Sequence, residues 1–309
     1  MIRLQQYRAR SETAPARVLV AIPAHNEDRY IGSLVLKLRA AGYEVLVVDD
    51  GSTDRTAEVA AAAGARVAGH VDNRGKAAAV RTAFDQARAS AADALVLLDG
   101  DSQHDPLEVD QVVDPVLNGI ADMVVGSRFV GSTSRIPRWR TVGQHALTLA
   151  TNIGSGVSVS DSQSGFRAFS RKALEGMRLQ HVGFSVESEM QFEARALGLE
   201  VLEVPISVHY ELPTKRNPVG QGWNVVDAVL RLVAQHRPLL FFSLPGLLIF
   251  VAGLALGVQV VRIYEATLTL AIGYALITVL LTVVGILAAF IGIMLHTVRA
   301  LFVEFSKRP

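Results

Sequence analysis

Two carboxylates that follow one apolar run are the residues best suited to chemistry in this sequence. Asp99 and Asp101 come directly after Ala94–Leu98. Residues i and i+2 of an extended chain point the same way, so both carboxylates can face one ligand. Neighbouring carboxylates repel each other unless a cation or a proton lies between them, and Mg²⁺ binds through one or two carboxylates plus substrate phosphates. The pair therefore predicts a metal site that also takes phosphate oxygens, with Gln103 as a further ligand and Gly100 leaving room for a nucleotide.

Acidic residues also end two earlier apolar runs. Asp50 follows Glu44–Val48, and Glu27 follows Val18–Ile22. One interpretation is that both side chains contact the base or ribose of a nucleotide. The alternative is ordinary turn and helix-capping chemistry, which also produces isolated Asp-x-Asp pairs. For Asp50 and Glu27 the spacing leaves both interpretations open, whereas the position of Asp99 and Asp101 after a buried strand favours a ligand site.

The scaffold that must position these residues alternates apolar runs with helical segments. The predicted strands are Val18–Ile22, Glu44–Val48, Arg66–Ala68, Ala94–Leu98 and Met123–Gly126, and predicted helices lie at about 30–41, 55–64, 75–88 and from 105 onward. This alternation predicts a mostly parallel, doubly wound α/β sheet. Ligands of such sheets bind beyond the carboxyl ends of the strands, which is where Asp50 and Asp99 fall.

Beyond residue 139 the pattern is weaker. We expect a helix at Trp139–Ile153, strands at Phe166–Phe169 and Val201–Val208, and a helix at Phe184–Leu197. The last of these helices carries Glu187 and Glu189, which are candidate general bases. The helix is nevertheless expected to expose both side chains to solvent, which favours a structural interpretation.

The C-terminal part is far more apolar than the rest. Residues 238–296 contain two charged side chains, Arg262 and Glu265. The first run, Leu239–Val261, and a second at about Thr267–Leu295 are each long enough to cross a bilayer core of roughly 30 Å. The alternative is a pair of buried core helices, which is disfavoured because soluble cores seldom use neighbouring helices that are apolar all round. Basic residues flank the outer ends of the two runs, so we expect an integral membrane protein with both termini, and the domain that carries Asp99 and Asp101, in the cytoplasm.

These patterns divide the chain into five parts. They are a tail at 1–16, a catalytic domain at 17–212, an interface loop and amphipathic helix at 213–237, a transmembrane hairpin at 238–296 and a cytoplasmic tail at 297–309. Arg135, Arg138 and Arg140 lie beside Trp139, a composition that favours contact with a lipid surface.

Composition excludes several classes of protein. The 309 residues carry a net charge of +1, which gives no case for nucleic-acid binding, and they include no cysteine. Disulfides, thiolate metal sites and a cysteine nucleophile are therefore excluded. The polar N-terminal segment is not expected to be a secretory signal.

Several short motifs occur together and in order. They are Ile22–Glu27, Val47–Asp54, Asn73–Lys76, Leu98–Pro106 and Gly126–Phe129, followed by Asp161–Arg167 with the pattern D-x-x-S-G-F-R. Over about residues 18–170 the sequence resembles glycosyltransferase family 2, in particular its dolichyl-phosphate mannose synthase-like branch. The resemblance implies a GT-A fold, a nucleotide-binding α/β sheet with an acceptor half, and membrane helices commonly follow it.

The resemblance also implies roles for individual residues. Pro23, Ala24, Glu27 and Asp50 would line the nucleoside pocket, Lys76, Asp99, Gly100 and Asp101 would complete the nucleotide-sugar site, and Asp99, Asp101 and Gln103 would hold Mg²⁺ or Mn²⁺. Arg128 would bind the acceptor phosphate with Arg135 or Arg138, Arg167 would lie near the reacting phosphates, and Lys215 or Arg216 would close over them. The sequence departs from the family at His25, where a tyrosine is common, and near Ser102, and Pro213–Gly220 matches the family's basic loop loosely.

The charges of the reactants predict a mechanism. A lipid phosphate is an anion near neutral pH and can attack C1 of the sugar directly, so no strong general base is needed. The metal would neutralise the departing nucleoside diphosphate, and arginines would grip phosphates bidentately. A single displacement inverts the anomeric centre, as the resemblance also implies.

The leading hypothesis is inverting transfer of mannose or glucose to polyprenyl or dolichyl phosphate at the membrane. GDP-mannose and UDP-hexoses both stay open as donors, and so does a homo-oligomer. A processive polysaccharide synthase is one alternative, but those enzymes carry a Q-x-x-R-W motif and more membrane helices, and this sequence has neither. A non-catalytic membrane scaffold that binds nucleotide-sugar is the other, and the intact Asp99 and Asp101 pair argues against it.

Overall fold

The computed structural model describes residues 16–131, 138–179, 185–208 and 238–306. Contacts group the chain into two compact units, Met1–Val226 and Asp227–Pro309, and each is described by itself. The amphipathic helix expected at Trp223–Arg237 lies outside the described residues.

The first unit is built on one seven-stranded sheet with the order β3-β2-β1-β4-β6-β5-β7. The strands are β1 Val18–Ala24, β2 Glu44–Asp49, β3 Arg66–Gly69, β4 Ala94–Leu97, β5 Met123–Ser127, β6 Arg167–Ser170 and β7 Val201–Pro205. Every pairing is parallel except those of β6, which runs antiparallel to both β4 and β5. The predicted, mostly parallel α/β sheet is therefore confirmed.

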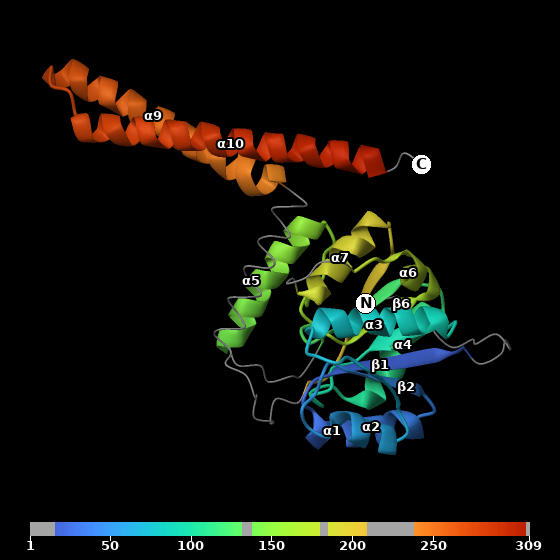
Figure 1. Ribbon diagram of the computed structural model, residues 1–309. Helices are drawn as coiled ribbons and strands as arrows, with labels where there is room; N and C mark the ends of the chain where they lie inside the picture. The colour runs from blue at the N-terminus through green and yellow to red at the C-terminus, as the bar shows by residue number, and fades with distance from the viewer. Residues whose placement is uncertain (1–15, 132–137, 180–184, 209–237, 307–309) are drawn as a thin grey trace. The chain divides into compact units, whose positions relative to one another are not determined.

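Helices cover both faces of this sheet. They are α1 Asp28–Ala40, α2 Thr56–Ala62, α3 Lys76–Ala89, the short η1 Pro106–Glu108, α4 Val109–Leu117, α5 Arg138–Ser155, α6 Arg171–Gly176 and α7 Val186–Ala196. Successive residues of β1 belong to opposite cores, because Leu19 packs with α3, α6 and α7 while Val20 packs with α1 and α4. In Figure 1, α1 and α2 accordingly lie on one side of β1 and β2, and α3 lies on the other. Burial on both faces explains why the strands read as nearly continuous apolar runs.

The antiparallel strand decides what meets at the carboxyl edge of the sheet. Because β6 runs against its neighbours, its first residue, Arg167, pairs with Leu97 at the end of β4 and with Val125 in β5. The preceding segment, Asp161–Phe166, is thereby brought to the edge where Asp99 follows β4. Two motifs that are far apart in the sequence therefore share one site.

The second unit is a helical hairpin. A π-helical turn, η2 Leu239–Ser243, leads into α9 Leu244–Thr267, and α10 spans Ile272–Ser306. The two helices pack closely at glycines: a Cβ added to Gly246 would lie 2.6 Å from the Ala289 backbone nitrogen. The second apolar run, expected from about Thr267, forms a helix from Ile272 onward, because Thr267 ends α9 and the chain turns at Leu268, which has a left-handed backbone.

Both helices of the hairpin are long and apolar enough to span a membrane. The spans are Leu239–Thr267 and Ile272–Val298, with mean hydropathies of 2.5 and 2.8. In each, 11% of the most apolar window is buried within the protein, whereas the core helix of a soluble protein would be mostly buried. Their apolar side chains therefore lack a protein core, and a lipid environment would cover them.

Candidate active site

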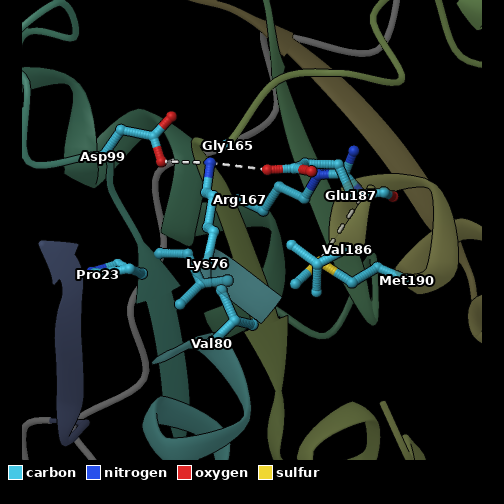
Figure 2. Close-up of a pocket in the computed structure, with 10 residues that line it drawn as sticks. Pro23, Lys76, Val80, Asp99, Gly165, Arg167, Val186, Glu187 and Met190 are labelled. Atoms are coloured by element: carbon cyan, nitrogen blue, oxygen red, sulfur yellow. Dashed lines mark hydrogen bonds and ion pairs between the residues drawn. The ribbon is translucent and has the colours of Figure 1, made fainter. Parts of the chain in front are cut away.

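Three charged side chains from different elements meet at the carboxyl edge of the sheet. Lys76, the first residue of α3, places its Nζ 2.6 Å from Oδ1 of Asp99 and 2.7 Å from Oε1 of Glu187 (Figure 2). Asp99 follows β4, and Glu187 lies in the first turn of α7. We refer to these three residues as the Lys76 cluster. The side chains of Lys76, Asp99 and Glu187 are 42%, 27% and 11% exposed, so the cluster opens to solvent at the lysine.

Electrostatics distinguish the two carboxylates of the Asp-Gly-Asp segment. Burial acts to raise the pKa of Asp99, but Lys76 holds that pKa below its ordinary value. Burial and the charge of Asp99 instead raise the pKa of Asp101 to about 6. Asp101 is thus a carboxylate that a further cation would stabilise. Gln103 is held close by, since its backbone N–H donates to Oδ1 of Asp101 at 3.1 Å.

This donor set fits a divalent cation. Two carboxylates and an amide oxygen are hard oxygen ligands, and a cation beside Asp101 would offset the burial and the charge of Asp99 that raise the pKa of Asp101. Within the described residues no group of three or more His, Cys, Asp and Glu side chains forms a complete metal site. A cation here would therefore depend on substrate oxygens to fill its coordination sphere.

The expectation that α7 exposes its glutamates is wrong. Both residues are buried: measured over the whole residue, Glu187 is 9% exposed and Glu189 is 1% exposed. Glu187 accepts a hydrogen bond from Ser185 Oγ at 2.7 Å, and its pKa lies below its ordinary value because Lys76 outweighs the effect of burial. Nothing in the local sequence shows this, since Lys76 and Glu187 meet only through the packing of α3 against α7.

A small cavity lies beside the Lys76 cluster. Pro23, Asp99, Gly165 and Glu187 are among the residues that line it (Figure 2). Gly165 is the glycine of the D-x-x-S-G-F-R motif, and a Cβ added there would overlap the carboxylate of Asp99. The motif needs glycine at this position because the Asp99 carboxylate lies directly against the backbone.

Arg167 also lines this cavity, but its guanidinium donates hydrogen bonds to backbone carbonyl oxygens. It is 1% exposed and donates to the carbonyl oxygens of Ser162 at 2.6 Å, Ser164 at 2.9 Å and Glu187 at 2.8 Å. The resemblance implies a place near the reacting phosphates. In the structure, the buried Arg167 side chain links the Asp161–Phe166 segment to α7 through these hydrogen bonds, which fixes both relative to Asp99.

Arg128 is held at the end of β5 by a buried partner. Its Nε and Nη2 each lie 2.6 Å from a carboxylate oxygen of Asp161, which is fully buried. Glu203 of β7 holds the same segment by accepting from the backbone N–H of Ser160 at 2.8 Å and of Asp161 at 3.2 Å. The sequence motif contains Asp161, but its pairing with Arg128 emerges only from the fold.

The residues expected to line a nucleoside pocket gather at the ends of β1 and β2. A Cβ on Gly100 would lie 3.4 Å from the carbonyl oxygen of Pro23, so the ends of β1 and β4 are adjacent. Asp50 is 3% exposed. Its Oδ1 forms a hydrogen bond of 2.7 Å with Nδ1 of His70 and accepts one of 3.0 Å from the backbone N–H of Arg74. His70 is thus a further residue that sequence reasoning missed.

Neighbouring loops are fastened to each other around Asp50. The backbone N–H of Glu27 donates to Thr56 Oγ1 at 2.8 Å, and Nδ1 of His25 lies 2.9 Å from the Asp50 carbonyl oxygen. Ala24 ends β1 beside them. The loop after β1 is therefore fixed to the loop after β2.

Four further residues have no described side chain. Arg138 is the first residue of α5, but its side chain is not among those described, and Arg135, Lys215 and Arg216 lie outside the described residues altogether.

Comparison with known proteins finds similarity to one family. The sequence profile of the family described as Glycosyl transferase family 2 matches residues 19–178. Polyprenol monophosphomannose synthase of Mycolicibacterium smegmatis is 36% identical over 209 residues, which cover 62% of this chain and 77% of that protein. UDP-N-acetylglucosamine–dolichyl-phosphate N-acetylglucosaminyltransferase of Methanococcus voltae is 31% identical over 215 residues, which cover 62% of this chain and 86% of that protein.

The fold is also found among solved structures. A crystal structure of glucosyl-3-phosphoglycerate synthase from Mycobacterium tuberculosis with phosphoglyceric acid superposes with a TM-score of 0.55 at 25% identity, covering 71% of this chain and 80% of that one.

Proposed function

Because this chain belongs to glycosyl transferase family 2 and is a glycosyltransferase, we propose that it transfers one hexose from a nucleotide-sugar to polyprenyl phosphate at a membrane surface. The observation that carries this proposal is the pair of carboxylates, Asp99 and Asp101, at the end of β4. Lys76 offsets the charge of Asp99. Burial and the charge of Asp99 raise the pKa of Asp101, so one more cation would stabilise the charged form of Asp101.

We propose that Asp99, Asp101 and Gln103 would hold this cation, either Mg²⁺ or Mn²⁺. When bound, it would supply a Lewis acid that neutralises the negative charge of the departing diphosphate. Lys76 lies beside the same carboxylates and would add a second positive charge for the diphosphate oxygens.

The acceptor side of the site is proposed to centre on Arg128. Asp161 fixes the guanidinium at the end of β5, and a planar guanidinium suits a phosphate anion. An ionised lipid phosphate needs no strong base, so its oxygen attacks C1 as the bond from C1 to the donor diphosphate breaks, with inversion. Glu187 is a poor general base in this arrangement, because Lys76 lowers its pKa.

The donor is not decided by similarity. The two relatives named above match equal shares of this chain, yet one is named for mannose and the other for N-acetylglucosamine. Proposed donors are therefore GDP-mannose and UDP-hexoses, with Pro23, Ala24, Glu27 and Asp50 around the nucleoside.

The experiment is a donor panel. The full chain in lipid nanodiscs is incubated with polyprenyl phosphate, Mn²⁺ or Mg²⁺, and radiolabelled GDP-mannose, UDP-glucose or UDP-N-acetylglucosamine. The proposal expects organic-extractable label from one donor, dependent on both lipid phosphate and metal. Absence of lipid-phosphate-dependent label from every donor would overturn it, and label that elongates a saccharide would favour a polysaccharide synthase.

Gly165→Ala tests how closely the Asp99 carboxylate is fitted. The added Cβ would overlap that carboxylate, and we expect kcat to fall about 100-fold, as misplacement of a reacting group by about 1 Å can cause. Gly69→Ala is the matched control, because a Cβ there meets nothing within 4 Å. Equal activity of the two variants, at equal thermal stability, would contradict this account of the glycine.

We further propose that the catalytic unit and both chain ends lie on the cytoplasmic side. The support is the position of basic residues such as Arg231, Arg237 and Arg299, which flank the outer ends of the hairpin, whereas residues 268–271 between its two helices carry no charge. Because the chain has no cysteine, one introduced thiol reports its own side of the membrane. We expect an impermeant maleimide to label Leu270→Cys, between α9 and α10, in intact cells, and Asp85→Cys, on α3, only after lysis. The reverse pattern would refute this orientation.

A further inference from the structure

Lys76 is shared between two carboxylates that differ in how firmly they are held. Glu187 is anchored at the start of α7: its carboxylate accepts from Ser185 Oγ, and its backbone carbonyl oxygen accepts from buried Arg167 at 2.8 Å. Its place in the first turn of an 11-residue helix also stabilises its negative charge. Glu187 is therefore a fixed partner for the lysine.

Asp99 has two competing uses. It is the closest partner of the Lys76 ammonium, at 2.6 Å, and it belongs to the carboxylate pair proposed to hold a divalent cation. The carboxylate cannot retreat toward Gly165, because it already lies against that backbone. A cation that binds Asp99 must therefore compete with the ammonium of Lys76.

The lysine is the member of the cluster that can move. Its side chain is 42% exposed, against 27% for Asp99 and 11% for Glu187. A four-carbon stem lets the ammonium shift without moving the backbone. With Glu187 only 2.7 Å away, the ammonium can leave Asp99 and remain fully paired.

We propose that Glu187 is a positioning residue that draws the Lys76 ammonium off Asp99, which frees Asp99 for the divalent cation and keeps Lys76 beside the donor diphosphate. This inference rests on the proposed function, since it takes Asp99 as a ligand of the metal. It adds to that function a residue whose carboxylate acts through Lys76, without touching metal or substrate.

Glu187→Gln is the direct test, because glutamine keeps the shape and an oxygen acceptor but removes the charge. Asp99 then becomes the one carboxylate of the cluster left to pair with Lys76, and the ammonium competes more strongly with the cation. We expect Mn²⁺ to bind the full chain about twofold to fivefold more weakly, the scale of a partly exposed ion pair. The readout is the electron paramagnetic resonance signal of free Mn²⁺, with the protein in zwitterionic nanodiscs at pH 8, with and without UDP or GDP.

A double-mutant cycle separates this role from a general loss of negative charge. If Glu187 acts through the lysine, Glu187→Gln has no further effect on Mn²⁺ affinity in a Lys76→Gln background. If it acts through space or by supporting the fold, the same loss appears in both backgrounds, and the inference is overturned. Glu175→Gln is the matched control, since Glu175 is paired with Arg171 at 2.7 Å but is 60% exposed.

The outcomes also separate this inference from the proposed function. Unchanged Mn²⁺ affinity in Glu187→Gln, with normal Mn²⁺ binding and lipid-dependent transfer by the unaltered chain, overturns the inference alone. Failure of the unaltered chain to bind Mn²⁺ in the presence of either nucleotide overturns both the metal site and the inference.

Discussion

Asp101→Asn is expected to reduce hexose transfer to a small residual rate while leaving the fold intact. The substitution removes one of two carboxylates but keeps the side-chain volume and an oxygen that accepts from the Gln103 N–H. Loss of one preorganised electrostatic group at a site of developing charge lowers kcat by about 100-fold to 1,000-fold. Because burial and Asp99 raise the pKa of Asp101 to about 6, neutralising this residue relieves repulsion in the protein without metal. Thermal stability should therefore be unchanged or slightly higher, even though activity falls.

The control for this variant is Asp85→Asn on α3, whose carboxylate is 71% exposed and pairs with Arg88. It should retain full transfer. Removing the metal with a chelator should reduce the unaltered protein to the level of Asp101→Asn and leave that variant unaffected. Normal turnover by Asp101→Asn, or turnover that survives chelation, would remove the metal from the proposed mechanism.

Much of the scaffold could be predicted because its strands are buried on both faces. The runs before Asp50 and Asp99 read as apolar segments between helices, and they form β2 and β4. The predicted strand at Phe166–Phe169 corresponds to β6 at Arg167–Ser170, but its direction was not visible. A four-residue strand carries no local signal for antiparallel pairing, which depends on where its two neighbours lie.

The same limit applies to the candidate site. Side chains at strand ends could be placed because position along a strand is a local property, and this holds for Asp99, Asp101 and Asp50. Ion pairs between distant segments could not, and Lys76 with Glu187 and Arg128 with Asp161 are the clearest cases. Glu187 was expected in solvent since helix periodicity alone does not show that the start of α7 packs against α3.

Arg128→Ala is expected to have two separable effects, one on stability and one on transfer. Asp161 is fully buried and bonded to Arg128 through both carboxylate oxygens, so the variant leaves an uncompensated buried charge. Breaking a buried pair in this way lowers the free energy of unfolding by about 3–5 kcal/mol. Arg171→Ala is the contrast, because the Arg171 and Glu175 pair is 40% and 60% exposed and should contribute less than about 1 kcal/mol.

The double variant Arg128→Ala, Asp161→Asn separates the two effects. Removing the orphaned charge should restore most of the lost stability, since no buried ion is then left unpaired. Transfer should stay low, because the proposed ligand of the acceptor phosphate is still missing. A charged hydrogen bond of ~1.5–3 kcal/mol corresponds to a loss of about 10-fold to 150-fold in kcat/KM for polyprenyl phosphate. Chemical unfolding and transfer assays on the same preparations measure both quantities. Recovery of transfer together with stability would show that Arg128 only supports the fold, and the acceptor phosphate would then need another ligand.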